Sequence, residues 1–481
     1  MSTRITILGA GSGGYIAAIR AAQLGAEITV IERDNIGGTC LNWGCIPTKT
    51  LKATAELMEK FRRARELGVE VEGEVRANMA RLMARKQEVI DNLATGILKI
   101  LKSYKIQYMR GEGHVLEPNR VRVKGMDNSI MDVISDKLIL AMGSCPLNIS
   151  AFPFDGKKIL SSDDAINLQE IPESILIIGG GVIGCEFAFI FASLGSKVTV
   201  VEAMSRMLPL PSIDDDCSRV IQREMKKRKI RFMVNRTVER VEEDGKRLRV
   251  TIGLSSFSQE PKGKKLTPMT VEVDRVLVCI GRKPNTADVG LNKLGVKMDD
   301  KGWIVVNERM ETNVPHVYAI GDVLGPSKIM LAHAASAEGL VAAENALGGN
   351  RGMNYDVVPF GVFTFPEVAC VGLTEGQARE RGSDVRGDTF LLRVLGKAQA
   401  VGEIVGQVKI VSDTKSKKIL GVHIVGPHAA DLISEGTLAI QMGATVKDLA
   451  ETIHAHPTFS EALMEASHKA LDAPLHYLRQ D

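Results

Sequence analysis

Two cysteines, Cys40 and Cys45, lie within the segment GGTCLNWGCIPTK at residues 37–49. They are the only two of the seven cysteines that lie close to each other in the sequence. A pair of this kind can bind a metal, form a structural disulfide, pack in an apolar core or act as a redox couple. The residues around the pair discriminate among these four possibilities.

A zinc site needs four ligands, and no histidine or third cysteine lies near Cys40 and Cys45. The neighbouring letters GG, NWG and IP are typical of turns, which disfavours simple core packing. Five positions of regular helix rise about 7.5 Å, whereas a disulfide needs Cα atoms about 4.4–6.8 Å apart. A bond between these cysteines therefore requires a distorted turn, which Gly44 and Pro47 favour. A short loop adds little stability, so a reducible redox pair is favoured and no metal is expected.

Two glycine-rich motifs of the form GxGxxG each follow a short apolar strand and precede a helical pattern. Their glycines are Gly9, Gly11 and Gly14 in the first copy and Gly179, Gly181 and Gly184 in the second. The first glycine makes the turn, the second lets the backbone approach a pyrophosphate, and the third lets helix and strand pack closely. The phosphates then lie at a helix N-terminus, where free N–H groups favour negative charge.

An acid follows each motif at the end of the next apolar strand. Glu32 ends ITVIE and Glu202 ends VTVVE, each 23 positions after the first glycine of its motif. A carboxylate in this place can accept hydrogen bonds from a ribose diol. A glycine turn without a ligand is the alternative for one copy alone, but two copies with matched acids predict two dinucleotides. Because Glu202 would repel a 2′-phosphate, NAD is favoured over NADP, although Arg206 follows four positions later.

The composition excludes several broad classes of protein. A chain of 481 residues is long enough for two to four domains. The net charge of +3 and the 4% of aromatic residues disfavour nucleic-acid and membrane-surface partners.

The apolar run at residues 5–8 is too short for a signal peptide, so we expect a cytoplasmic protein. Residues 175–195 could span a bilayer by length, but their consecutive glycines favour a strand, a turn and a buried helix.

The residues around each motif predict a strand, a turn, a helix and a second strand, an order that is typical of doubly wound α/β sheets. Residues 51–105 predict two long helices, and residues 253–268 predict an exposed hairpin loop. From about Pro359, longer strands followed by helices predict a separate domain. We therefore expect an α/β chain with two Rossmann-like, doubly wound dinucleotide-binding domains and a C-terminal α+β domain.

The segment GGTCLNWGCIPTK resembles the redox-disulfide signature of the class I pyridine nucleotide-disulfide oxidoreductases. IGRKPNT, AIGD, MLAHAA and TFPEVACVG also resemble this family, and the resemblance covers essentially the whole chain. HAHPTFSEAL, at residues 454–463, resembles the branch of the family that oxidises dihydrolipoyl groups. The resemblance implies an FAD-binding domain (1–148), an NAD-binding domain (149–271), a central domain completing the FAD site (272–348) and an interface or dimerisation domain (349–481).

The resemblance also implies a role for each site residue. Cys40 would be the thiol that meets the substrate, and Cys45 would lie against the flavin of a tightly bound, non-covalent FAD. His456 would be the acid–base, oriented by Glu461, and both would come from the partner subunit of a homodimer. An imidazole titrates near neutrality and can accept the proton that a dithiol must lose. Further FAD contacts are implied for Lys49, Glu186, Gly113, Met142, Gly143, Ser144, Asp322, Met330, Leu331, Ala332 and His333, and further NAD contacts for Val238 and Gly281.

The implied function is oxidation of dihydrolipoyl groups on carrier proteins with reduction of NAD to NADH, within 2-oxoacid dehydrogenase or glycine cleavage complexes. An NADPH-dependent disulfide reductase of the glutathione or mercuric reductase type is the alternative enzyme. Glu202 and the lack of a cysteine pair in APLHYLRQD disfavour it. A non-catalytic flavoprotein subunit is the alternative from another class, and the retained cysteines, lysine and histidine disfavour it. Met142, Phe363 and Lys397 depart from the family pattern.

Overall fold

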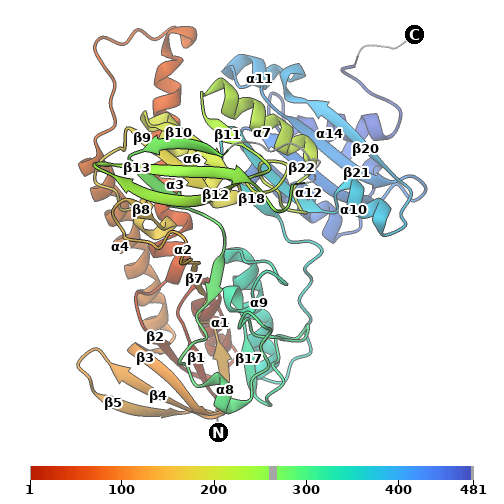
Figure 1. Cartoon of the computed structure of the whole chain (residues 1–481). Coiled ribbons are helices and arrows are strands. Elements are labelled where there is room, and N and C mark those ends of the chain that lie inside the picture. The colour runs from red at the N-terminus through yellow and green to blue at the C-terminus, as the bar shows by residue number, and fades with distance from the viewer. Residues whose placement is uncertain (1, 259–267, 478–481) are drawn as a thin grey trace.

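The computed structural model of the chain (Figure 1) describes residues 2–258 and 268–477. A seven-stranded sheet organises the N-terminal region in the order β17-β6-β1-β2-β3-β4-β5. These strands are β17 (Val317–Ala319), β6 (Lys137–Leu140), β1 (Arg4–Leu8), β2 (Glu27–Glu32), β3 (Gln107–Glu117), β4 (Arg120–Gly125) and β5 (Ile130–Ile134). The run from β17 to β3 is parallel, and β4 and β5 extend it in antiparallel fashion. Helices α1 (Ser12–Gln23) and α9 (Ala332–Ala346) pack against each other beside this sheet.

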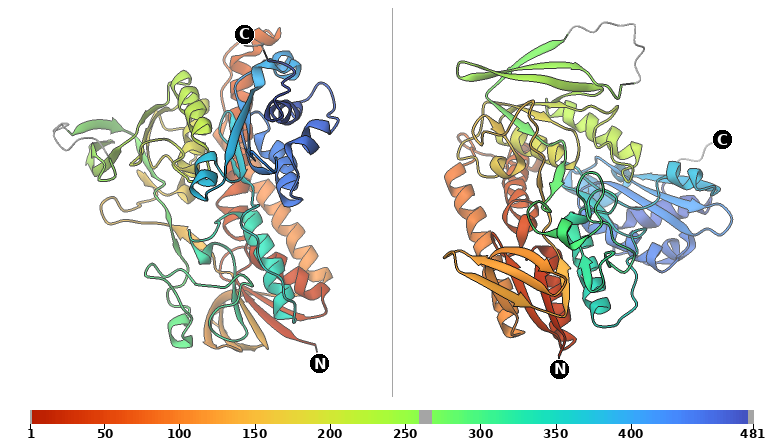
Figure 2. Two further views of the ribbon diagram at one scale, coloured as in Figure 1. Left: turned by 90° about the vertical axis from the view of Figure 1, so that its right-hand side faces the viewer. Right: turned by 60° about the horizontal axis from the view of Figure 1, so that its bottom comes forward.

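A second, parallel sheet has the order β11-β10-β9-β15-β8. Its strands are β11 (Arg231–Met233), β10 (Lys197–Val201), β9 (Ser174–Ile178), β15 (Arg275–Val278) and β8 (Ile159–Leu160), and α6 (Val182–Leu194) and α7 (Asp215–Lys227) belong to this region. The antiparallel strands β12 (Arg236–Asp244), β13 (Arg247–Leu254) and β14 (Met269–Val273) form a projecting three-stranded sheet (Figure 2). Most of the hairpin loop predicted at 253–268 lies outside the described residues.

The strand, turn and buried helix expected within residues 175–195 are confirmed as β9, a glycine turn and α6. The parallel order of both sheets places the N-termini of α1 and α6 at the carboxyl ends of β1 and β9, where doubly wound sheets bind ligands. Across the part of the chain that the structure describes, no helix combines the length and apolarity needed to cross a membrane.

The C-terminal region is built on an antiparallel sheet of order β18-β19-β22-β21-β20, covered by helices. The strands are β18 (Phe360–Val362), β19 (Glu367–Gly372), β22 (Ile419–Gly426), β21 (Gln407–Asp413) and β20 (Val385–Leu391). The helices are α10 (Glu375–Glu380), α11 (Gly396–Val401), α12 (Ala429–Gln441), α13 (Val446–Glu451) and α14 (Glu461–Ala470). The expected fold class, two doubly wound regions and a C-terminal α+β domain, is confirmed.

The two long helices expected after the cysteines are α3 (Cys45–Arg62) and α4 (Met79–Ser103). Leu51 and Ala55 of α3 pack on Ile190 and Leu194 of α6, so α3 is buried against the second sheet region. The remaining short elements are α2 (Gly38–Asn42), η1 (Ala64–Leu67), β7 (Ser144–Pro146), α5 (Ser162–Ala165), β16 (Arg282–Pro284), α8 (Leu291–Leu294), η2 (Gly321–Leu324) and η3 (Leu392–Val394).

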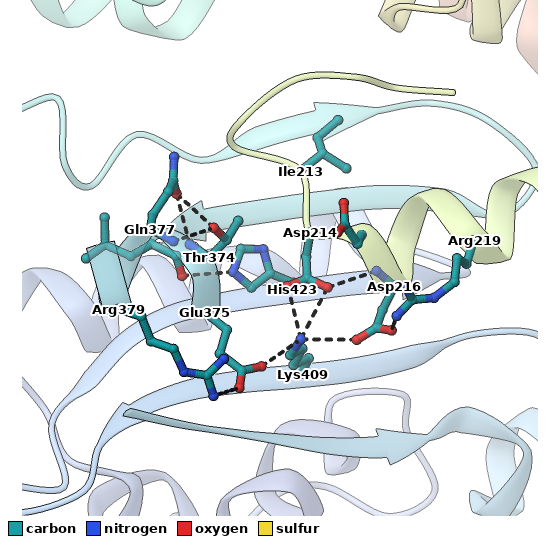
Figure 3. Close-up of polar contacts among 12 residues, drawn as sticks. Ile213, Asp214, Asp216, Arg219, Thr374, Glu375, Gln377, Arg379, Lys409 and His423 are labelled. Atoms are coloured by element: carbon teal, nitrogen blue, oxygen red, sulfur yellow. Dashed lines mark hydrogen bonds and ion pairs between the residues drawn. The ribbon is translucent and has the colours of Figure 1, made fainter. Parts of the chain in front are cut away.

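A buried ion cluster joins α7 to the C-terminal sheet (Figure 3). Lys409 Nζ, on β21, lies 3.1 Å from both Asp214 Oδ2 and Asp216 Oδ2 and 3.2 Å from Glu375 Oε2. One arginine pairs with Asp216 and another with Glu375, so the positive and negative charges of the cluster balance. Removing one of these groups would leave its buried partner without a compensating charge, which is costly. The cluster therefore fixes the C-terminal sheet against the second sheet region.

Candidate active site

Cys40 and Cys45 lie on either side of a break between two helices. Cys40 belongs to α2, and Cys45 is the first residue of α3. Gly44 lies between the helices with φ −135° and ψ −111°, outside the helical region. Cys40 is half-buried and Cys45 is exposed, and both are free thiols. The local backbone is therefore the distorted turn that a bond between these cysteines requires.

The two thiols differ in acidity. A hydrogen bond from the Cys40 thiol lowers the pKa of Cys45 from its usual 9.0 to about 7, and the Lys49 ammonium also lowers it. The same hydrogen bond raises the pKa of Cys40, and burial raises it further. Cys45 also begins a helix of 18 residues, whose free N–H groups favour an anion. Cys45 is therefore the more acidic thiol of the pair.

Lys49 lies one helical turn after Cys45 and is paired with a buried acid from another region. Its Nζ is 2.8 Å from Glu186 Oε2, on α6. Glu186 Oε1 also accepts the backbone N–H of Phe363 at 3.0 Å. The Phe363 ring lies below the Lys49 ammonium, with its centroid 4.1 Å from Nζ. The structure thus brings Lys49 and Glu186 together beside Cys45 and adds Phe363, which the sequence marks only as a departure from the family.

The two glycine turns share one backbone geometry. Gly9 and Gly179 both have φ +105°, a left-handed conformation that favours glycine. A Cβ on the third glycine would lie 2.0 Å from the Gly9 oxygen in the first turn and 1.9 Å from the Gly179 oxygen in the second. Any side chain there would separate the helix from the strand, so the close packing requires glycine.

The middle glycine of each turn faces open space. A Cβ on Gly11 would lie 4.0 Å from the nearest neighbouring atom, and nothing lies within 4 Å of one on Gly181. Gly11 and Gly181 immediately precede α1 and α6, whose first N–H groups have no partner within the helix. Each turn is a cradle that a side chain would fill and that a pyrophosphate can enter. The residues present therefore fit two dinucleotides.

Glu32 and Glu202 hold equivalent places beside the two turns. In both, one oxygen accepts the N–H of the residue after the first glycine, at 2.7 Å for Glu32 and 2.5 Å for Glu202. The other accepts the N–H two positions after the acid, at 2.8 Å and 2.7 Å. Each oxygen retains a lone pair for a ribose hydroxyl. Burial raises the pKa of Glu32 against the pull of its two N–H donors.

A cleft beside the first turn collects residues from distant parts of the chain. Gly113, Met142 and Gly143, expected as FAD contacts, line it together with the turn itself. Asn285 also lines it and donates a 2.9 Å hydrogen bond to the Met142 oxygen. Trp43, between the two cysteines, is another lining residue. This cleft extends from the first glycine turn toward the dithiol segment, as an elongated dinucleotide requires.

The remaining residues expected at FAD lie near the end of the same sheet. Asp322, in η2, accepts a 2.8 Å hydrogen bond from Ser144 Oγ. Arg282 Nε donates to that hydroxyl at 2.6 Å, a contact that the sequence does not signal. Residues 330–333 lead into α9, and His333 Nε2 is 2.7 Å from the Pro359 oxygen.

Two residues expected at NAD have different settings. Gly281 has φ +133° and no atom within 4 Å of a Cβ position, so its backbone is open to a ligand. Val238, on β12, is buried in a core cluster with Val201 and Ile252. A contact with NAD at Val238 would therefore have to use the backbone, and it stays a prediction.

His456 and Glu461 form a separate pair in the C-terminal region. His456 Nδ1 is 2.8 Å from Glu461 Oε1, and Glu461 Oε2 accepts the Thr458 N–H at 2.8 Å. Burial acts to raise the pKa of Glu461, but this N–H and the imidazole lower it. The carboxylate holds a proton on Nδ1 and leaves Nε2 as the reactive nitrogen. His456 has 75% of its side chain exposed, and among the residues described it makes no hydrogen bond to either cysteine of the dithiol.

His454, which the sequence leaves as a structural or supporting residue, has its own partners. Its Nε2 lies 2.8 Å from Glu435 Oε1, and its Nδ1 lies 2.8 Å from the Thr452 oxygen. The hydrogen bond to Glu435 raises the pKa of His454. Both ring nitrogens are engaged, so His454 supports the segment that carries His456 and is not itself a free base.

Comparison with known proteins gives matches along nearly the whole chain. The family profile described as pyridine nucleotide-disulphide oxidoreductase matches residues 3–339, and the profile of its dimerisation domain matches residues 358–467. A dihydrolipoyl dehydrogenase of Chlamydia trachomatis is 42% identical over 98% of this chain and 97% of its own length. One from Geobacillus stearothermophilus is 38% identical over 99% of this chain and 98% of its own length.

Two solved structures are similar in fold. LpdA from Mycobacterium tuberculosis superposes with a TM-score of 0.88 at 29% identity, covering 97% of this chain and 99% of its own. A HOCl-induced flavoprotein disulfide reductase from Escherichia coli superposes with a TM-score of 0.81 at 28% identity, covering 96% of this chain and 98% of its own.

The lowered pKa of Cys45 predicts its reactivity. In the reduced protein, iodoacetamide should alkylate Cys45 with a pH midpoint near 7, because the thiolate is the nucleophile. Lys49→Met should move this midpoint upward, because the ammonium that stabilises the thiolate is lost. Peptide mass spectrometry after timed alkylation at a series of pH values measures both midpoints. A wild-type midpoint at the ordinary thiol value of 9.0 would contradict the account.

The glycine geometry predicts opposite outcomes for two alanine substitutions in the second turn. Gly181→Ala should fold normally, since nothing lies within 4 Å, but should weaken dinucleotide binding by about tenfold or more. Gly184→Ala should lower the melting temperature instead, because its methyl would lie 1.9 Å from the Gly179 oxygen. Thermal unfolding and ligand titration separate the two effects, and identical behaviour of the variants would be incompatible with the proposed roles.

Proposed function

The chain belongs to the pyridine nucleotide-disulphide oxidoreductase family, and we propose that it oxidises dihydrolipoyl groups on carrier proteins and reduces NAD to NADH. The observation that carries the proposal is the dithiol, in which Cys45 begins α3 beside the Lys49–Glu186 pair and Cys40 lies across the break at Gly44. FAD and NAD are its cofactors, as the family and the relatives imply. Bound FAD supplies two-electron chemistry between the dithiol and NAD.

The first glycine turn, Glu32 and the cleft beside it would hold FAD, and the second turn and Glu202 would hold NAD. Both carboxylates are placed for a ribose diol. A 2′-phosphate at Glu202 would meet a carboxylate at close range, so the residues favour NAD over NADP. Lys49 and Glu186, on adjacent helices beside Cys45, would face the flavin.

The acidities of the two cysteines give the direction of sulfur exchange. In the oxidised enzyme, Nε2 of His456 takes the proton of one substrate thiol, and the resulting thiolate attacks Cys40 Sγ. The Cys40–Cys45 bond breaks, a substrate–Cys40 disulfide forms, and Cys45 leaves as a thiolate. A thiol of low pKa is the better leaving group, which favours attack at Cys40. The second substrate thiol then attacks the mixed disulfide and gives its proton to the departing Cys40 sulfur, which releases the cyclic disulfide product and the Cys40 thiol while His456 keeps the first proton.

We propose that His456 comes from the partner subunit of a homodimer. Its side chain is 75% exposed, and among the residues that the structure describes Glu461 is the one acid paired with it. Residues 358–467, which match the dimerisation domain of the family, include it. The same region exposes the large apolar side chains of Leu438, Met442 and Ile453, which a second copy would cover.

Finer features of the proposal rest on the sequence. The domain division at 1–148, 149–271, 272–348 and 349–481 stays a prediction. We propose a cytoplasmic enzyme that serves the lipoyl carriers of 2-oxoacid dehydrogenase or glycine cleavage complexes. Relatives with dihydrolipoyl dehydrogenase names support partners of this general kind.

A steady-state assay tests the function directly. The purified protein should be yellow, and dihydrolipoamide with NAD should generate NADH at 340 nm, with NADP at least about tenfold less effective. A parallel assay measures the oxidation of NADPH with oxidised glutathione as the electron acceptor. A strong preference for NADPH-driven glutathione reduction would replace the proposed function with that of a disulfide reductase.

His456→Gln tests the proposed base. It should slow dihydrolipoamide oxidation by about 100-fold, while NADH-dependent reduction of an artificial electron acceptor changes little, because only the dithiol step needs the base. His476→Gln is the matched control. His476 is also exposed, and it pairs with Glu465, which lies one helical turn after Glu461 on α14. Equal loss in both reactions for His456→Gln would show that the residue acts structurally.

A further inference from the structure

Residues 363–367, FTFPE, connect β18 to β19 and lie against the helix that begins with Cys45. Glu367, at the start of β19, places Oε1 2.6 Å from Lys52 Nζ on α3. The two side chains are only 12% and 14% exposed, so this is not a solvent-screened surface pair. Lys52 lies seven positions after Cys45 and three after Lys49, which puts the three residues on one face of α3.

Glu367 also contacts the C-terminal region with its second oxygen. Oε2 accepts the backbone N–H of Ala430 at 3.2 Å, in the first turn of α12. A carboxylate is favoured there by the unpaired N–H groups and the helix dipole. Leu438 of α12 and Met442, the residue just after this helix, are exposed on the surface that we assign to the partner subunit. The Glu367 carboxylate therefore links α3, which begins with Cys45, to α12, which lies at the proposed subunit interface.

Phe363 connects this pair to Lys49. Its ring centroid lies 4.1 Å from Lys49 Nζ and 5.7 Å from Lys52 Nζ, and the Phe365 centroid lies 5.5 Å from Lys52 Nζ. The Phe363 N–H is bound to Glu186, the partner of Lys49. Cation–π attraction and this hydrogen bond hold the two ammonium groups and the aromatic ring as one unit.

The arrangement predicts what happens when one charge is removed. Without Lys52, the Glu367 carboxylate loses its close ammonium partner while it remains largely buried beside Phe363. An uncompensated buried charge attracts nearby cations, and Lys49, one helical turn away on the same face, would then be shared between Glu186 and Glu367. Movement of Lys49 toward Glu367 would take its charge away from Cys45, whose thiolate it stabilises.

We propose that Lys52 and Glu367 are a positioning pair, which holds Lys49 beside Cys45 and couples the placement of α12 to the dithiol. The pair acts on Cys45 through Lys49 and Phe363. The inference rests on the proposed function for its meaning in turnover, but its main readout, the reactivity of Cys45, does not require turnover.

The test compares four forms of the FAD-loaded dimer: wild type, Lys52→Met, Lys52→Arg and Lys60→Met. Lys60 is the matched control, because it is an exposed lysine of α3 whose Nζ lies 3.6 Å from Glu56, a residue that Lys52 also approaches. In the dithiol-reduced protein at pH 7, Lys52→Met should slow alkylation of Cys45 by about threefold or more. Lys52→Arg should restore the rate because the charge remains, and Lys60→Met should match wild type.

In turnover, Lys52→Met should lower kcat for dihydrolipoamide by a similar factor and leave KM for NAD unchanged, since Glu202 and Gly181 lie outside the pair. Wild-type Cys45 reactivity and kcat in Lys52→Met would overturn the proposal, as would an equal loss in Lys60→Met. If wild type itself fails to oxidise dihydrolipoamide, the proposed function fails while the alkylation result still decides the pair.

A double variant keeps the test decisive if Lys52→Met folds poorly. Lys52→Met with Glu367→Gln removes both charges, so no unpaired carboxylate remains to attract Lys49. Alkylation of Cys45 should return to within about twofold of the wild-type rate. A double variant in which Cys45 reacts as slowly as in the single variant would contradict the mechanism by which the pair acts.

Discussion

The site depends on keeping a negative charge on the first residue of α3. The helix N-terminus, the Cys40 thiol and the Lys49 ammonium all stabilise a thiolate at Cys45. The break at Gly44 makes this possible, because one continuous helix would hold Cys40 and Cys45 about 7.5 Å apart along its axis. A carboxylate partner on another element then fixes Lys49, which is why α3 must be buried against α6.

The same solution for binding a dinucleotide is used twice around this centre. Both turns combine a left-handed first glycine, an open second position and a third position that admits no side chain. Both place a carboxylate on the backbone just after the first glycine. Each of the two sheets thus supplies one cradle that fits a dinucleotide, while the Lys409 cluster anchors the C-terminal sheet to the second sheet.

Features that are local in the sequence could be predicted from it. The glycine motifs and their acids follow from fixed spacings within one strand–turn–helix unit, and His456 and Glu461 lie five positions apart. The assignment of Glu186 to Lys49 came from family resemblance, since nothing physical in the sequence pairs two residues that distant. Lys52 and Glu367 were missed for the same reason: their contact exists only after β19 packs on α3. The burial of Val238 likewise results from tertiary packing of β12.

A working site would combine the dithiol of one chain with His456 of the partner subunit. Subunit exchange between Cys45→Ser and His456→Gln dimers tests it most directly. Each parent has no complete site, but a hybrid dimer has one intact dithiol facing one intact histidine. Random exchange should therefore restore about one quarter of wild-type dihydrolipoamide oxidation, because half of the dimers are hybrids with one site each. A mixture no more active than its parents would show that the two groups act within a single chain.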